Sequence, residues 1–315
     1  MGKLVDKTLS AVVISITPFD EKGRLDEAAL RRQLGRLREV GVSVYVAGSG
    51  SGEGYTLTPE ERDRVLALAV EELKGKVPVR AMGCEPRLIG EMVDFMRAAE
   101  RARVDAAQIF SLEIGHGSKP TVAEMERYYS TVIESTSLPV YLSSHRAAGY
   151  FLPLDLVERL VNRYRSIAGI AYSGTDIGYL AELIARVGDR IEVHSAGPAN
   201  ALPVLVLGGN GFMGGEGNLV PGLFASVISA WQSKDMERLR ESYGKLIALT
   251  AISNRYGGSS MRAMKPLMNA FGLPGGTLRA PRLPISAADL ADVVQAVLRL
   301  QIPGLPPLAS PKLKA

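Results

Sequence analysis

The chain has 315 residues, of which 46% are hydrophobic and 22% are charged, so it can bury a substantial core. The 37 basic and 33 acidic residues give a net charge of +4, and the basic ones are scattered, which argues against nucleic-acid binding. The single cysteine excludes an intrachain disulfide, and no apolar run is long enough to span a membrane. Because the sequence also lacks a signal-peptide pattern, we expect a cytoplasmic protein.

Eight short and nearly continuous apolar segments predict strands that are buried on both faces. They lie at residues 11–16, 42–48, 77–83, 105–111, 138–144, 167–173, 191–197 and 211–215. Segments with helical periodicity separate them. The first repeats apolar side chains at Leu30, Leu34, Leu37 and Val40, and the second opens at residues 58–61 with a Thr-Pro-Glu-Glu capping box. Further helices are predicted to begin near Pro86, Pro120, Pro153, Asp176, Asn200 and Pro221.

This alternation predicts the α/β class and a closed (β/α)8 barrel, the TIM barrel, over residues 1–233. No strand signal follows it. Residues 235–254, 260–271 and 287–300 are predicted to be helices, which would form a C-terminal helical subdomain over residues 234–303. Residues 304–315 are rich in proline and predict a loosely ordered tail.

The functional residues of such a barrel lie at the C-terminal ends of its strands. The glycine-rich stretch at residues 48–53 could cradle a carboxylate or phosphate with its backbone N–H groups and its serines, or it could simply form a tight turn. We therefore select polar strand-end residues as ligand-binding candidates. They are Thr17, Ser49, Gly50, Ser51, Glu53, Ser143, Ser195 and Glu216.

Glu113, His145 and Tyr172 are the candidates for acid–base chemistry at the same strand ends. No closely spaced pair of metal ligands accompanies them, so we expect neither a metal nor another cofactor. His194, inside the seventh predicted strand, is interpreted as a hydrogen-bonded wall residue. The lone Cys84 is interpreted as a small apolar filler.

Four stretches, taken in order, resemble the dihydrodipicolinate synthase and N-acetylneuraminate lyase family of pyruvate aldolases. They are ITPFDEKGRLD (16–26), GSGSGEGYTLTPEER (48–62), LGGNGFMGGEGNLVP (207–221) and KPLMNAFGLPGGTLRAPRLPIS (265–286). The resemblance implies a barrel with a helical tail, a small oxo acid or carboxylate as ligand, and a homodimer or homotetramer. It also implies a structural role for Lys265, which matches a lysine of the family.

The resemblance fails at the residues that carry the family's chemistry. Members form a Schiff base with a lysine in a Gly-Ile-Lys motif on the sixth strand, whereas this chain has Gly169-Ile170-Ala171. The relay tyrosine of the fifth strand falls on Ser143 by one count and on Leu142 by another. The fourth-strand Pro-Tyr-Tyr-Asn run is replaced by Leu-Glu-Ile-Gly at 112–115, and the second-strand threonine pair is replaced by Gly50 and Ser51.

These observations leave two hypotheses for the function. In the first, the protein is a lyase or hydratase of small oxo acids that works without the usual imine, with Glu113, His145 and Tyr172 as its acid–base groups and Ser51 holding a carboxylate. In the second, it is a non-catalytic member, either a small-molecule binder or the partner subunit of an active homologue.

Overall fold

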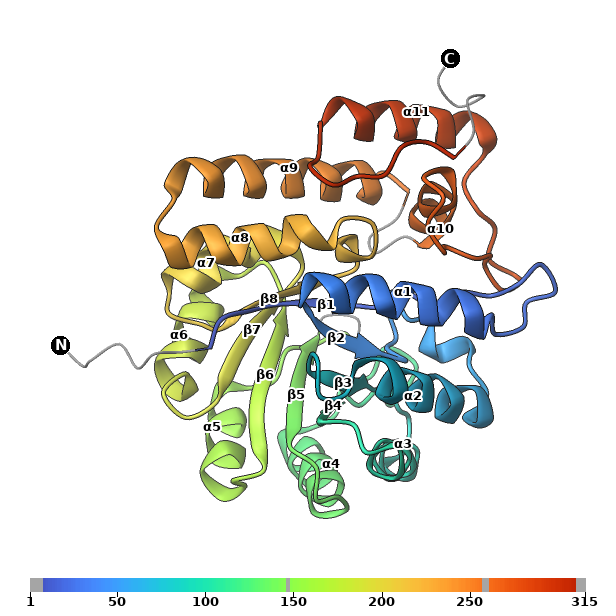
Figure 1. Ribbon diagram of the computed structural model, residues 1–315. Helices are drawn as coiled ribbons and strands as arrows, with labels where there is room; N and C mark the ends of the chain where they lie inside the picture. Colours follow the sequence, from blue (N-terminus) through green and yellow to red (C-terminus); the bar gives the residue numbers. More distant parts are fainter. Residues whose placement is uncertain (1–7, 146–147, 257–260, 310–315) are drawn as a thin grey trace. The chain divides into compact units, whose positions relative to one another are not determined.

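The computed structural model describes residues 8–145, 148–256 and 261–309. Within them, eight parallel strands form a closed barrel in chain order (Figure 1). The strands are β1 (Ser10–Ile14), β2 (Ser43–Val46), β3 (Val79–Met82), β4 (Ala106–Ile109), β5 (Val140–His145), β6 (Ile167–Ser173), β7 (Glu192–Ala196) and β8 (Gly211–Gly214). Each strand overlaps one of the predicted apolar segments, so the predicted barrel is confirmed.

A helix follows each strand. These helices are α1 (Glu27–Val40), α2 (Pro59–Leu73), α3 (Ile89–Ala102), α4 (Val122–Glu134), α5 (Leu154–Arg163), α6 (Ile177–Val187), α7 (Ala201–Val206) and α8 (Pro221–Ser233). The predicted C-terminal helices are also present, as α9 (Met236–Asn254), α10 (Met261–Ala270) and α11 (Ala287–Arg299). Ser260, the first residue of the predicted second C-terminal helix, lies outside the described residues.

Local sequence explains where the helices begin. The Thr58 hydroxyl accepts a hydrogen bond from the Glu61 N–H at 3.2 Å, and the Glu61 carboxylate accepts one from the Thr58 N–H at 3.1 Å, which is the predicted capping box. On α1, three of the four predicted core positions are buried, whereas Val40, at the last helical residue, is 38% exposed because the helix ends there. The buried three are Leu30, Leu34 and Leu37.

Two compact units make up the chain. One comprises Met82–Met213 with the N-terminal segment through Ala11, and it carries β4 to β7 and α3 to α7. The other comprises Val12–Ala81 and Gly214–Ala315, and it carries β2, α1, α2 and α8 to α11. The proposed division into a barrel ending at residue 233, a helical subdomain and a tail stays a prediction, and residues 310–315 of that tail lie outside the described residues.

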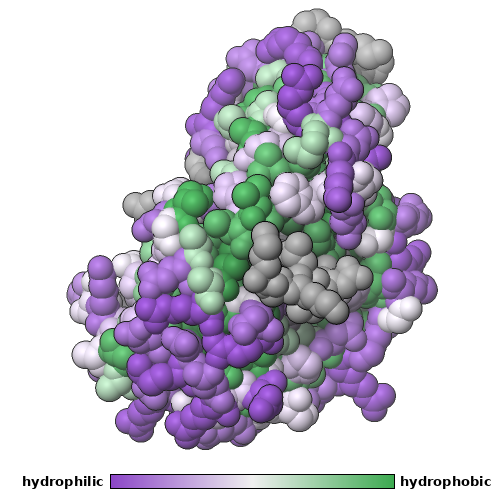
Figure 2. All heavy atoms as spheres, turned by 90° about the vertical axis from the view of Figure 1, so that its left-hand side faces the viewer, coloured by the Kyte–Doolittle hydropathy of each residue, from purple (hydrophilic) through white to green (hydrophobic). Residues whose placement is uncertain are grey.

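Hydrophilic side chains cover much of the face shown in Figure 2, with hydrophobic side chains between them. The large hydrophobic residues that are exposed come from many separate elements, as Leu88, Val206 and Leu283 illustrate. Among the helices of the described residues, none combines the length and the apolar character that crossing a membrane requires. Single exposed apolar side chains of this kind are ordinary on a folded protein.

Candidate functional site

Ala171, the residue predicted to stand at the position of the family's imine-forming lysine, is buried. Ala171 of β6 is 3% exposed and lies in register with Ser143 of β5 and His194 of β7. Residues paired across parallel strands point to the same face of the sheet, so these three side chains share one face. That face therefore presents a methyl group, a hydroxyl and an imidazole, and none of them is an amine that could attack a carbonyl.

Tyr172 points to the opposite face, towards the helices. Its ring stacks on Tyr179 of α6 with 4.7 Å between ring centres, and Phe151 packs against it at 5.1 Å. Its hydroxyl accepts a hydrogen bond from the Asp176 N–H at 3.1 Å. Burial raises the pKa of Tyr172 above its usual value. The structure thus does not bring this tyrosine together with Ser143 and Ala171, because successive residues of a strand alternate between faces.

Further polar side chains lie on the same face as Ala171: Tyr141 and Glu192 are in register with Gly169, two residues earlier, and His194 is in register with Ala171 itself. Tyr141 of β5 donates a hydrogen bond to Glu192 Oε2 at 2.7 Å, and His194 Nε2 lies 2.9 Å from the Ser10 hydroxyl. Gly169 makes room for the Tyr141 ring, since a Cβ there would overlap it. His194 is thus the hydrogen-bonded wall residue that the sequence predicts, and Tyr141 is engaged by Glu192.

His145 ends β5 in register with Ser173, and its ring centre lies 5.2 Å from that of Phe110. Burial lowers the pKa of His145 below its ordinary value, and the Glu85 carboxylate acts in the opposite direction. Glu113 is half-buried, and its N–H donates to the Pro86 carbonyl at 2.8 Å. These groups are the acid–base candidates that lie at the ends of β3, β4 and β5.

The other strand-end hydroxyls of this unit are buried. The Ser143 carbonyl accepts hydrogen bonds from the Ser111 hydroxyl at 2.9 Å and from Tyr129 at 3.4 Å, which fix the end of β5. Ser195 is fully buried in register with Tyr172, and its hydroxyl has no hydrogen-bond partner among the described residues. Ser195 therefore shares the helix-facing side of the sheet with Tyr172.

In the other unit, buried residues anchor the glycine-rich loop that follows β2. Thr17 is 1% exposed, and its hydroxyl donates to the Gly52 carbonyl at 2.7 Å. Ser51 is buried against Gly215, where a Cβ would overlap the serine hydroxyl. Ser49 is half-buried and Gly50 is exposed. The loop thus has one side anchored in the protein and its tip open, as an anion-binding loop requires.

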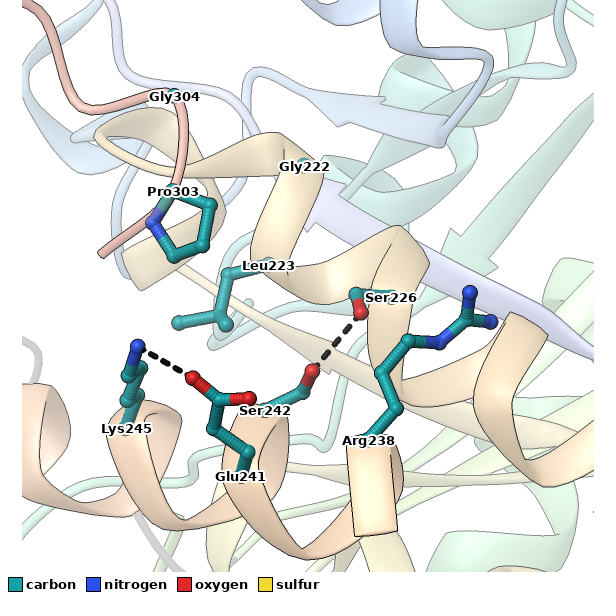
Figure 3. Close-up of a pocket in the computed structure, with 9 residues that line it drawn as sticks. All are labelled: Gly222, Leu223, Ser226, Arg238, Glu241, Ser242, Lys245, Pro303 and Gly304. Carbon is teal, nitrogen blue, oxygen red and sulfur yellow. Dashed lines mark hydrogen bonds and ion pairs between the residues drawn. The ribbon is translucent and has the colours of Figure 1, made fainter. Parts of the chain in front are cut away.

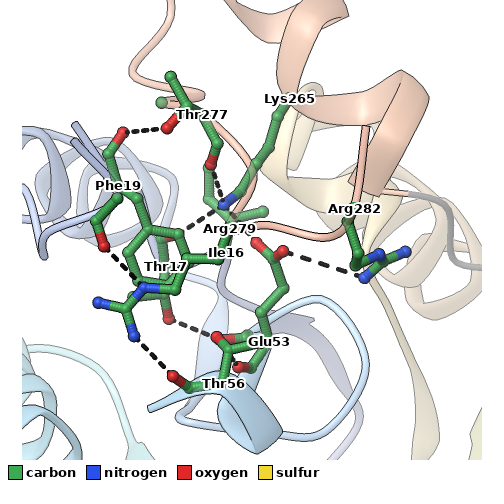
Figure 4. Close-up of polar contacts among 12 residues, drawn as sticks. Ile16, Thr17, Phe19, Glu53, Thr56, Lys265, Thr277, Arg279 and Arg282 are labelled. Carbon is green, nitrogen blue, oxygen red and sulfur yellow. Dashed lines mark hydrogen bonds and ion pairs between the residues drawn. The ribbon is translucent and has the colours of Figure 1, made fainter. Parts of the chain in front are cut away.

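Glu53 ends this loop in the left-handed region, with φ of 50°, and its side chain is fully buried (Figure 4). Its carboxylate forms an ion pair with Lys265 of α10, which is also fully buried. The Lys265 ammonium donates to the carbonyls of Thr17 and Thr277, both at 2.8 Å, and lies 4.5 Å from the Phe19 ring centre. Burial lowers the pKa of Lys265, while the Glu53 carboxylate opposes that shift. The predicted structural role of this lysine has a physical basis in these contacts.

Two arginines from the same C-terminal stretch also reach the loop. Arg282 lies 3.9 Å from Glu53 Oε1. Arg279 donates to the Thr56 carbonyl and to the Glu61 carboxylate, and its guanidinium lies 4.1 Å from the Phe19 ring centre. Lys265 and Arg282 therefore contact the end of the loop at Glu53, and Arg279 holds the segment that follows it (Figure 4). The sequence signal for this arrangement was the family-like spacing of residues 265–286, which does not specify the partners.

Glu216, the remaining carboxylate candidate, begins a short 3-10 turn after β8 and is half-buried. Burial raises its pKa, and a hydrogen bond with Thr250 opposes that shift. No cluster of three or more histidine, cysteine or acidic side chains in the described ranges could hold a metal ion. Cys84 is half-buried and forms no disulfide.

The closed parallel barrel with a helix after each strand defines a TIM-barrel protein. Residues 7–300 match the model of the dihydrodipicolinate synthetase family, so the chain belongs to that family. It is 28% identical over 289 residues to the 4-hydroxy-tetrahydrodipicolinate synthase of Methanosarcina acetivorans, covering 91% of this chain and 96% of the relative. It is 30% identical over 251 residues to that of Methanopyrus kandleri, covering 79% and 81%.

The solved structures agree with this assignment. A crystal structure of a dihydrodipicolinate synthase superposes with a TM-score of 0.84 at 27% identity, covering 92% of this chain and 98% of the other. The fold and the family expected from the resemblance are thereby confirmed.

Proposed function

We propose that this family member binds a small oxo acid or related carboxylate at its strand ends and does not form the family's Schiff base. The observation that carries the proposal is Ala171, a buried methyl group at the position where β6 would present the amine. The sequence from Lys119 to Lys234 contains no other lysine, so β5, β6, β7 and β8 supply no alternative amine.

The lysines outside this stretch are poor substitutes. Lys119 is exposed, in the loop before α4. Lys265 is buried, and its ammonium is committed to two carbonyl groups and to the Glu53 carboxylate. An ammonium group has no lone pair with which to attack a carbonyl carbon, and these three acceptors favour the charged form of the lysine.

Reductive trapping tests this proposal. The protein is incubated with pyruvate and borohydride, and its intact mass is measured. We expect no adduct, and we expect an adduct with Ala171→Lys as the matched variant, because a desolvated lysine at that position can attack the ketone. A stoichiometric adduct on the unaltered protein would overturn the proposal.

The proposed binding of a carboxylate rests on the loop at residues 48–53 and on its Ser51 side chain. A ligand present at about 100 times its dissociation constant adds about 2.7 kcal/mol to the free energy of unfolding. A thermal-shift screen of oxo acids, sugar acids and amino acids should therefore identify binders, and Ser51→Ala should weaken their effect. Ser233→Ala, an exposed serine at the last residue of α8, is the control. An unchanged melting temperature with every acid would contradict the proposed carboxylate binding.

We propose two alternative functions for the protein. As an enzyme, the protein would be a lyase or hydratase that uses His145 and Glu113 for proton transfer, with Tyr172 kept as a packing residue by its contacts with Tyr179. As a non-catalytic member, it would bind its ligand or pair with an active homologue. The absence of a tyrosine at Leu142 and Ser143 favours the second. Loss of turnover in His145→Gln would support the first.

We also propose a homodimer or homotetramer, as the family resemblance implies. Light scattering coupled to size-exclusion chromatography measures the assembled mass. A monomer at micromolar concentration would contradict this proposal.

A further inference from the structure

A second cavity lies among α8, α9 and the segment after α11, in residues that the proposed function does not use (Figure 3). Its volume is about 510 Å³, which falls within the range of small-molecule sites. Its lining residues are Gly222, Leu223, Ser226, Arg238, Glu241, Ser242, Lys245, Pro303 and Gly304. We name this cavity the α8–α9 pocket.

A pair of serine hydroxyls forms its polar floor. Ser226 Oγ of α8 and Ser242 Oγ of α9 lie 2.8 Å apart, and Ser242 is only 6% exposed. One hydroxyl proton lies between the two oxygens. The other makes no hydrogen bond to the residues that the structure describes, so it is available to a ligand oxygen.

The charged side chains make one end of the pocket receptive to an anion. Arg238 lies beside the hydroxyl pair (Figure 3). Its Nη2 donates to Ser229 at 2.9 Å and its Nε lies 3.9 Å from Asp235 Oδ2, while its Nη1 makes no hydrogen bond to the described residues. Lys245 lies beyond Leu223 and is neutralised by Glu241, to which it donates at 2.7 Å. Its second bond, to the Gln301 carbonyl at 2.9 Å, holds the segment that closes the pocket.

The remaining lining is apolar. Leu223 is 4% exposed and faces Pro303 across the pocket, and Gly222 leaves space beside them (Figure 3). Lys245 is neutralised by Glu241, so the lining charge left for a ligand is that of Arg238, which meets Asp235 only at 3.9 Å and matches a single negative charge better than two. We propose that the α8–α9 pocket binds a small amphipathic monocarboxylate, with its carboxylate on Arg238 and the serine hydroxyls and its apolar body against Leu223 and Pro303.

Gly222 provides a sharp test, because a Cβ added there meets no heavy atom within 4 Å and therefore projects into open space. Gly222→Leu should fill the pocket without disturbing α8, since leucine is a better helix former than glycine. Arg238→Gln removes the cation beside the serine hydroxyls. Arg240→Gln, an exposed arginine of the same helix outside the lining, is the matched control.

Binding of 4-fluorobenzoate is followed by fluorine NMR. We expect saturable binding to the unaltered protein, at least tenfold weaker binding to Gly222→Leu and to Arg238→Gln, and unchanged binding to Arg240→Gln. Hexanoate should compete, whereas inorganic phosphate and uncharged methyl benzoate should not. Melting temperatures establish that each variant is folded, and Ser242→Ala, which keeps the pocket open, should also weaken binding.

The proposal would be overturned if 4-fluorobenzoate did not bind at concentrations about tenfold above the millimolar dissociation constant expected of such a fragment. Equal binding to Gly222→Leu, or competition by phosphate equal to that by hexanoate, would overturn it as well. A benzoate bound instead at the loop of residues 48–53 would respond to Ser51→Ala and not to Gly222→Leu. The experiment therefore separates this pocket from the strand-end site.

Discussion

Lys265 and Glu53 form an ion pair in which both side chains are completely shielded from solvent. Removing two charges from water costs several kcal/mol per ion, so a buried pair is tolerated only where further polar contacts compensate. Here the carbonyls of Thr17 and Thr277 supply them. Because Glu53 ends the glycine-rich loop in a left-handed conformation, we infer that the pair positions this loop as well as stabilising the fold.

The pair predicts a marked asymmetry between single and double variants. Lys265→Met should lower the free energy of unfolding by about 3–5 kcal/mol, because it leaves the Glu53 carboxylate buried without its cation. The double variant Glu53→Gln with Lys265→Met should recover most of that loss. Urea denaturation measures both, with Lys245→Met of the exposed pair with Glu241 as the control. A loss below about 1 kcal/mol for Lys265→Met would contradict the buried pair.

Gly169→Ala should destabilise the barrel. Its Cβ would overlap the Tyr141 ring and lie 2.9 Å from the Glu192 carbonyl oxygen, so neither a side-chain shift nor a rotamer change relieves both contacts. We expect a loss of about 1–3 kcal/mol, the usual cost of overpacking a core. Gly222→Ala, where the added Cβ meets nothing, should be neutral or slightly stabilising. Thermal or urea denaturation of the two variants compares them, and equal stabilities would refute the packing argument.

Because burial lowers the pKa of His145, we expect the free energy of unfolding to decrease as the pH falls. In the unfolded chain the histidine takes up a proton near its ordinary pKa of about 6.5, whereas in the folded protein burial postpones uptake to a lower pH. Between these two pKa values the unfolded state binds more protons, so stability is lost as pH falls through this window. His145→Gln should flatten the pH dependence of the urea midpoint below pH 6.5 relative to the unaltered protein. An identical pH dependence of the urea midpoint in the two proteins would contradict this prediction.

Ala171→Lys should trap pyruvate yet fail to restore aldolase turnover. Burial lowers the pKa of a lysine at this position and thereby aids attack on the carbonyl, at a packing cost of about 1–3 kcal/mol. The proton relay would still be missing, because Ser143 lies beside residue 171 and Tyr141 donates to Glu192. General acid–base help is commonly worth about 10²–10⁴ in rate.

A steady-state assay of Ala171→Lys with pyruvate and aspartate semialdehyde, or with N-acetylneuraminate, measures this deficit. Turnover equal to that of an authentic family enzyme would show that the remaining machinery is intact, and the proposed remodelling of the site would then be wrong.

The sequence by itself determined the barrel, and it also predicts that the amine is missing. Continuous apolar segments, helical periodicity and the Thr58 capping box are local patterns, and local patterns are what a linear sequence records directly. The prediction that Ala171 replaces the family lysine rests on the Gly-Ile motif before it. The two-residue period of a strand also held a usable signal, since Tyr172 had to face away from its neighbour Ala171.

Only the tertiary structure decided which side chains meet. The partner of Glu53 proved to be Lys265, the partner of His194 proved to be Ser10, and the α8–α9 pocket arose where Leu223 faces Pro303. These contacts join segments far apart in the chain, and their geometry depends on strand register and helix packing that no single segment encodes. The loop of residues 48–53 could thus be recognised as a candidate from its glycines, whereas its contacts with the distant Lys265 and Arg282 could not.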